Sequence, residues 1–332
     1  MMNIRRIIFY GLLLTLILTY GIAFGQTKKE PKWDNTLNKS WPSGFQVVQI
    51  RSSADRTMQP AVFHSATGTE KMPLIVSLHT WSGDYTQNDP LATHVLNRNW
   101  NYIHPNFRGP NNHPNACGSP LVISDLEDAI DYAVQHGQVD TSEIHIIGVS
   151  GGGYATLLAF MEIHRKVKSF SAWVPISNLV SWYRESVPRK NKYAGDILAS
   201  TSKGKSLDVA EAKKRSPIFM KYPAKERDGS QLFIYTGAND GYLGSVPITQ
   251  SILFYNKLVK ERSRHPEKYL VPCKDIVTLL AERSFPKPAV PPMIGERKVY
   301  YHKSYKNIHL TVFEGRHEML DKVALDYVPV GK

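Results

Sequence analysis

A serine lies at the centre of a glycine-rich segment between a predicted strand and a predicted helix. Residues 148–153 read Gly-Val-Ser-Gly-Gly-Gly, which fits the pattern G-x-S-x-G. An apolar, β-branched run, residues 144–147, precedes this segment, and a helix-like stretch, residues 154–161, follows it. A strand that turns sharply into a helix lifts the side chain at the turn clear of the sheet. Ser150 is therefore a candidate nucleophile. A plain turn and a phosphate-binding loop are the alternatives, and the loop holds no lysine to favour phosphate.

A carboxylate and an imidazole follow later in the chain, in the order that such a nucleophile requires. Residues 231–235 predict a buried strand, and Asp240 lies in the loop after it. Residues 309–313 predict another strand, and His317 lies in the loop that follows. Because the loops at the carboxyl ends of parallel strands line one crevice, the sequence predicts that Ser150, Asp240 and His317 meet there.

The chemistry of these three residue types explains why their order matters. A serine hydroxyl is a poor nucleophile until a base takes its proton, and an imidazole titrates near neutral pH. A carboxylate behind the imidazole holds its tautomer and stabilises the imidazolium. Asp240 alone could equally be part of an Asn-Asp-Gly turn, and most histidines are structural. The ordered set after predicted strands favours a Ser150–His317–Asp240 triad.

The amides that would hold a developing oxyanion are predicted from the nucleophile and from an early loop. Residues 72–79 predict a strand that leads into Thr-Trp-Ser-Gly at 80–83. We assign the backbone N–H groups of Gly151 and Trp81 as donors. The Trp81 ring could instead form an apolar wall of the pocket, and His79 is expected to order this loop rather than react.

Over roughly residues 45–328 the chain resembles an α/β-hydrolase of the prolyl-oligopeptidase-like group, limited to its catalytic domain. The segments that carry the resemblance are residues 106–109, 121–140, 148–153, 215–218 and 237–247. The resemblance implies that Ser150, Asp240 and His317 are the triad. The peptidases of this group usually carry tyrosine where this chain has Gly151, and the chain has no room for their propeller. Both differences favour a small esterase.

The order of the predicted elements indicates the fold class. A chain of 332 residues with 42% hydrophobic residues can bury a large core. Predicted strands alternate with predicted helices, which favours a mostly parallel central sheet with helices on both faces. We expect one α/β-hydrolase domain over residues 26–332, with a cap insertion at 177–228 and a loop insertion at 261–298. A peripheral decoration is the alternative for the cap.

The amino terminus has the layout of a secretory signal peptide. Arg5 and Arg6 precede an apolar stretch, residues 7–24, with small residues at a cleavage position after Gly25. We expect residues 1–25 to be removed and the protein to be secreted or periplasmic. An uncleaved membrane anchor is the alternative. No later segment is long and apolar enough to suggest stable membrane insertion.

The two cysteines and the net charge bear on a possible disulfide and on possible binding partners. Cys117 and Cys273 would be exported to an oxidising compartment, so they form a disulfide or stay separate, and sequence does not decide which. The formal net charge of +12 permits a nucleic-acid partner, but an exported chain without a nucleic-acid-binding motif argues against one. Attraction to acidic polysaccharides is a weaker possibility. No segment has metal-ligand spacing, and we expect neither a metal nor a cofactor.

These observations predict a secreted serine hydrolase that cleaves carboxylic esters through an acyl-enzyme. The expected substrate is a small molecule or carbohydrate carrying acetyl or aromatic esters, which rests on the resemblance alone. An exopeptidase or aminoacyl hydrolase of the same group is the first alternative. The second is a non-catalytic surface protein that binds glycans.

Overall fold

The computed structural model describes residues 41–286 and 292–331. The predicted signal peptide, residues 1–25, lies outside the described residues. Among those that are described, we find no helix with the length and hydropathy needed to cross a bilayer.

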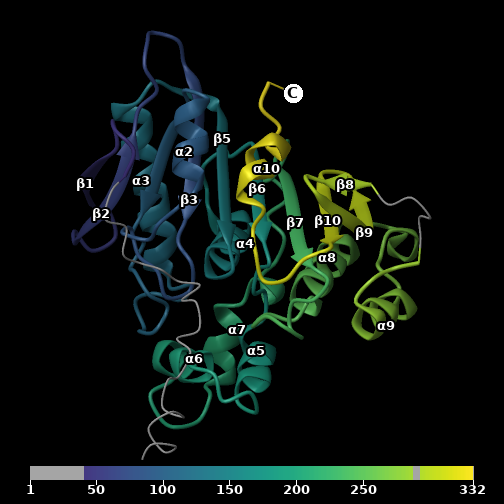
Figure 1. Ribbon diagram of the computed structural model, residues 1–332. Helices are drawn as coiled ribbons and strands as arrows, with labels where there is room; N and C mark the ends of the chain where they lie inside the picture. The colour runs from purple at the N-terminus through teal and green to yellow at the C-terminus, as the bar shows by residue number, and fades with distance from the viewer. Residues whose placement is uncertain (1–40, 287–291, 332) are drawn as a thin grey trace, which may run out of the picture. The chain divides into compact units, whose positions relative to one another are not determined.

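The described residues form a ten-stranded sheet with the order β1-β2-β4-β3-β5-β6-β7-β10-β9-β8 (Figure 1). The strands are β1 (Gln46–Arg51), β2 (Met58–His64), β3 (Met72–Leu78), β4 (Asn101–Pro105), β5 (Val139–Val149), β6 (Ser169–Trp173), β7 (Gln231–Gly237), β8 (Met293–Ile294), β9 (Arg297–Tyr305) and β10 (Ile308–Phe313). The strands from β4 to β10 in this order pair in parallel, whereas β1, β2, β8 and β9 add antiparallel edges. The predicted mostly parallel sheet is confirmed.

Helices cover both faces of this sheet, as predicted. The helices are α2 (Leu91–Asn97), α3 (Pro120–His136), α4 (Gly151–Glu162), α5 (Leu179–Ser186), α6 (Tyr193–Thr201), α7 (Val209–Lys214), α8 (Thr249–Arg262), α9 (Cys273–Glu282) and α10 (Asp321–Ala324), with short 3-10 turns η1 (Pro217–Phe219), η2 (Pro266–Lys268) and η3 (Leu325–Tyr327).

Strand periodicity divides the core between the two faces. In β3, Leu74 and Val76 pack in the cluster that contains residues of α3, α4 and α8, whereas Ile75 packs in the cluster that contains residues of α2 and α10. Successive side chains of a strand point to opposite faces, so both faces of a central strand need apolar residues. This explains why the central strands read as continuous apolar runs.

The cap region, residues 177–228, contains α5, α6, α7 and η1. Figure 1 shows these three helices grouped beyond one end of the strands. They share a core with the loop after β3 and with α4. The buried residues of this core include Trp81, Tyr154, Leu158, Ile176, Leu179, Trp182, Ile197 and Ala212.

The predicted loop insertion, residues 261–298, contains regular secondary structure. It begins inside α8 and ends inside β9, and between them lie η2, α9 and β8. The sequence did not indicate α8 or β9 as regular elements. Each has a solvent-facing side whose charged residues interrupt the apolar pattern. Residues 287–291 lie outside the described part of the chain.

Candidate active site

Ser150 sits at a strained junction between β5 and α4. Its backbone has φ 58° and ψ −116°, a conformation that non-glycine residues rarely adopt. Its N–H donates to the Trp173 carbonyl at 2.9 Å, which holds the turn against β6. A Cβ on Gly148 would lie 2.4 Å from the backbone of Gly152, so the helix can pass this close only because position 148 is glycine. The turn thus raises the Ser150 side chain above the end of the sheet.

The structure places His317 within hydrogen-bonding distance of both Ser150 and Asp240. His317 Nε2 lies 2.7 Å from Ser150 Oγ, and His317 Nδ1 lies 2.7 Å from Asp240 Oδ2. Asp240 follows β7 and His317 follows β10, and these strands are parallel neighbours. All three side chains are nearly buried, with residue exposures of 9%, 6% and 2% for Ser150, His317 and Asp240. The geometry fits a serine that donates to an imidazole and an imidazole that donates to a carboxylate.

The second oxygen of Asp240 is held by its own turn. Asp240 Oδ1 accepts from the N–H groups of Gly241 at 2.9 Å and Val246 at 3.2 Å. Gly244 passes so close that a Cβ there would lie 2.3 Å from the same oxygen and 2.7 Å from His317 Cβ. Residues 240–246, which we call the acid turn, therefore wrap both the carboxylate and the imidazole.

Gly151 and Trp81, the two predicted oxyanion donors, are direct neighbours. A Cβ on Gly151 would lie 2.1 Å from the Trp81 backbone nitrogen. The Trp81 carbonyl accepts from the Asn111 backbone N–H at 2.9 Å, which fixes this loop from the other side. The Trp81 ring is buried among the cap residues, edge-on to Trp182 with ring centroids 4.8 Å apart. Trp81 therefore supplies both an amide beside the elbow and an apolar wall beneath the cap.

His79 orders the oxyanion loop, as predicted. Its ring is buried and stacks on Phe107 with centroids 3.8 Å apart. The two ring nitrogens lie 2.9 and 2.8 Å from the carbonyl oxygens of Thr80 and Asn106. Burial lowers the pKa of His79 to about 4, so the ring is neutral at physiological pH and only one of its two nitrogens donates to a carbonyl.

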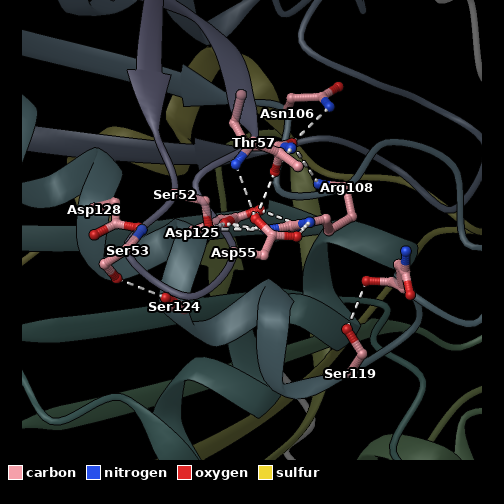
Figure 2. Close-up of polar contacts among 12 residues, drawn as sticks. Ser52, Ser53, Asp55, Thr57, Asn106, Arg108, Ser119, Ser124, Asp125 and Asp128 are labelled. Atoms are coloured by element: carbon pink, nitrogen blue, oxygen red, sulfur yellow. Dashed lines mark hydrogen bonds and ion pairs between the residues drawn. The ribbon is translucent and has the colours of Figure 1, made fainter.

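An ion cluster built on the buried side chains of Arg108 and Asp125 supports the neighbouring loop (Figure 2). Arg108 Nε and Nη2 donate to Asp125 at 2.6 and 2.9 Å, while Nη1 donates to Asp55 at 2.6 Å and Nη2 to Ser52 at 2.9 Å. Phe107 and Arg108 both have positive φ, 27° and 80°, so this loop is strained where the cluster holds it. The hydrogen bonds from Arg108 hold the pKa of Asp55 well below its usual range.

Cap residues reach both loops beside the elbow. The Trp81 indole donates to Asp196 at 3.1 Å, and Lys192 donates to Ser82. Arg189, which follows α5, donates to carbonyls of the acid turn. Sequence reasoning missed Arg189 and Asn111. Neither belongs to a motif, and their roles depend on contacts between segments far apart in the chain.

The disulfide that the sequence left open is absent, because Cys117 and Cys273 are both free thiols. Cys117 is buried, and burial raises the pKa of its thiol to about 12. Cys273 is exposed at the start of α9. Within residues 41–286 and 292–331, no group of three or more His, Cys, Asp or Glu side chains is arranged to hold a metal ion.

Known proteins share this fold and part of this sequence. Residues 121–271 match the model of the prolyl oligopeptidase family. Dipeptidyl peptidase family member 6 of Caenorhabditis elegans is 28% identical over 204 residues, which are 57% of this chain and 26% of that protein. This chain therefore spans about a quarter of the curated relative's length.

Two solved structures are similar in fold at lower identity. An acylaminoacyl peptidase of Pyrococcus horikoshii is 19% identical with a TM-score of 0.52, covering 67% of this chain and 36% of that one. A puromycin-hydrolyzing peptidase of Mycobacterium tuberculosis is 18% identical with a TM-score of 0.53, covering 66% of this chain and 34% of that one. The matched family domain includes the elbow and the acid turn, and the fold agrees with it. The chain therefore has the fold of an α/β-hydrolase, and its residues 121–271 match the prolyl oligopeptidase family.

Proposed function

We propose that this serine hydrolase cleaves amide bonds in short peptides or aminoacyl compounds through an acyl-enzyme on Ser150. The observation that carries the proposal is the continuous line of hydrogen bonds from Ser150 through His317 to Asp240, with 2.7 Å at each step. A serine with such a base needs no metal to attack a carbonyl carbon.

The proposed reaction follows from the positions of these atoms. Ser150 Oγ forms a bond to the substrate carbonyl carbon while His317 Nε2 takes the hydroxyl proton. The amides of Gly151 and Trp81 hold the resulting oxyanion. The carbon–nitrogen bond then breaks, and His317 returns the proton to the leaving amine. Water next attacks the acyl-enzyme carbonyl carbon and gives a proton to His317. The bond from that carbon to Ser150 Oγ then breaks, His317 returns the proton to Ser150 Oγ, and the acid is released.

The preference for peptides over esters is supported by the relatives. The curated relative and both solved structures are named as peptidases. The identities to these relatives are low and the coverage is partial, so we take the expected substrate from the residues of this chain's own cap. Trp81, Trp182 and Tyr193 lie together there, with Trp182 and Tyr193 rings 4.7 Å apart. Their apolar surfaces suit a hydrophobic side chain next to the scissile bond.

Ester hydrolysis is the second candidate, and one observation favours it. Gly151 follows the nucleophile where the related peptidases usually carry tyrosine, and the chain leaves no room for a side chain there. Ester hydrolysis needs less stabilisation of the oxyanion than amide hydrolysis, because an ester has a better leaving group. Fewer contacts near the oxyanion are therefore enough for an esterase. Acylated carbohydrates remain the proposed ester substrates.

One panel of substrates tests these readings. Purified protein is incubated with aminoacyl and dipeptidyl chromogenic amides and with acetyl and feruloyl esters, beside Ser150→Ala. Turnover of amides that Ser150→Ala abolishes supports the peptidase proposal, and turnover of esters alone moves the function to an esterase. Failure of a fluorophosphonate to label Ser150, together with binding of glycans, would replace both with a non-catalytic role.

We also propose that the protein is exported after removal of residues 1–25. The layout of the amino terminus supports this proposal. Sequencing the amino terminus of protein recovered from the medium or periplasm tests it. A mature chain that begins at Gln26 is expected, and full-length protein in the membrane fraction would contradict it.

A further inference from the structure

The acid turn has little apolar packing at its tip. Tyr242 is 67% exposed and Leu243 is 56% exposed, so side-chain burial does not fix the tip, although Val246 at the end of the turn is buried in the cap core. The N–H groups of Gly241 and Val246 nevertheless have to stay in place, because they hold Asp240 Oδ1. Beside the contact of Arg283 with the Tyr242 ring, hydrogen bonds from the cap are therefore the contacts that can fix the position of the tip.

Three such hydrogen bonds come from the cap. The Arg189 guanidinium donates to the carbonyl of Gly241 and, at 3.2 Å, to the carbonyl of Gly244. The Trp182 indole donates to the carbonyl of Ser245 at 2.8 Å. Arg189 thus spans the turn with one planar fork, a geometry that a lysine ammonium does not reproduce.

The two residues whose carbonyls accept from Arg189 also lie against the carboxylate. Gly241 donates its own N–H to Asp240, and Gly244 packs against both Asp240 and His317. A shift of Arg189 would therefore move the backbone that orients the carboxylate behind the imidazole. The ion pair of Arg189 with Glu185, at 3.4 Å on the surface, adds little stability by itself.

We propose that Arg189 is a positioning residue for the Asp240–His317 pair, through which the cap sets the alignment of the triad. This inference rests on the proposed function of Ser150. Since a misplacement of about 1 Å at a reacting group can reduce the rate about 100-fold, removal of the fork should reduce it by about 10- to 100-fold. KM should change little, because Arg189 contacts the turn rather than the reacting atoms.

The test compares Arg189→Ala and Arg189→Lys with a matched control, Arg184→Ala. Arg184 is an exposed arginine on α5, and the described residues include no hydrogen-bond partner for it in the acid turn. The first readout is the rate at which a fluorophosphonate labels Ser150, which does not depend on knowing the natural substrate. The second is the pH profile of kcat/KM on the best chromogenic substrate, and the third is rescue of Arg189→Ala by added guanidinium ion.

We expect Arg189→Ala to label about 10- to 100-fold more slowly, Arg189→Lys to lie between it and the wild type, and Arg184→Ala to match the wild type. The acidic limb of the pH profile should move to lower pH in Arg189→Ala, because a displaced carboxylate stabilises the imidazolium less, and guanidinium should restore part of the rate. Wild-type labelling rates in Arg189→Ala would overturn the inference while leaving the proposed function intact. An equal loss in Arg184→Ala would also overturn it, whereas absence of labelling in the wild type would remove the proposed function itself.

Discussion

Gly151→Ala tests how closely the elbow and the oxyanion loop fit together. An alanine Cβ at this position would lie 2.1 Å from the Trp81 nitrogen and 2.3 Å from its Cα. Since real contacts of this kind are hardly ever below 3.0 Å, the two backbone segments must separate by about 0.9 Å. A donor displaced by that distance no longer reaches an oxyanion that needs it at roughly 2.7–3.1 Å.

The expected cost is that of losing one oxyanion donor. Removal of such a donor typically lowers kcat by about 100- to 1,000-fold, equivalent to about 3–4 kcal/mol of transition-state stabilisation. We expect kcat to fall by this amount on a chromogenic substrate and KM to change much less, because the donor acts on charge that develops in the transition state.

Gly195→Ala is the matched control for this substitution. Gly195 lies in α6 of the cap, and a Cβ there would meet no atom within 4 Å. The control should keep full activity and gain about 0.5–1 kcal/mol of unfolding free energy, since alanine is favoured over glycine inside a helix. Urea denaturation of both variants separates misfolding from loss of the donor. A folded Gly151→Ala enzyme with kcat within about 3-fold of the wild type would refute the assignment of Trp81.

Three further predictions concern the rest of the molecule. Arg108→Leu leaves the buried Asp125 carboxylate without its partner, so the free energy of unfolding should fall by about 3–5 kcal/mol, and a urea titration showing a loss below about 1 kcal/mol would contradict this. Burial lowers the pKa of both His79 and His145 to about 4, so the stability that depends on their neutral rings is fully present above pH 6.5 and is lost as the pH falls towards 4. Urea midpoints measured between pH 7.5 and 4.5 should fall, by up to about 3 kcal/mol of unfolding free energy for His79, and a flat profile would argue against buried neutral rings. In the native protein a maleimide should modify one thiol per chain, at Cys273, with Cys117 reacting only after unfolding, and peptide mapping of the alkylated protein checks this.

The sequence predicted the central fold because the buried strands carry their own signal. Continuous apolar runs such as residues 72–78 occur where both faces of the strand are covered, and the alternation with helices indicates a parallel sheet. The strand predicted over residues 231–235 lies within β7, Gln231–Gly237. The strand β9, Arg297–Tyr305, was missed because most of its side chains are exposed or half-buried, so it has no continuous apolar run, and because it follows a proline-rich segment.

The part of the candidate site that lies in local sequence motifs could be predicted. Ser150, Asp240 and His317 each follow a strand, and topology alone then places them at one edge of the sheet. The contacts of Arg189 with the acid turn could not be predicted, since they join segments more than fifty residues apart through side-chain-to-carbonyl bonds that have no sequence pattern. Likewise, the glycine at 151 is recognisable in sequence, but the closeness of Trp81 that requires it is a property of packing.

Because Cys117 is buried and Cys273 is exposed, the protein can be labelled at a single cysteine. Cys273 begins α9, and at the far end of this helix Arg283 stacks on the exposed ring of Tyr242 in the acid turn, with the guanidinium carbon 4.8 Å from the ring centroid. A fluorophore attached to Cys273 would therefore sit one short helix away from the catalytic rim without any mutagenesis. Its emission during turnover could report directly whether that rim shifts as substrate enters and product leaves.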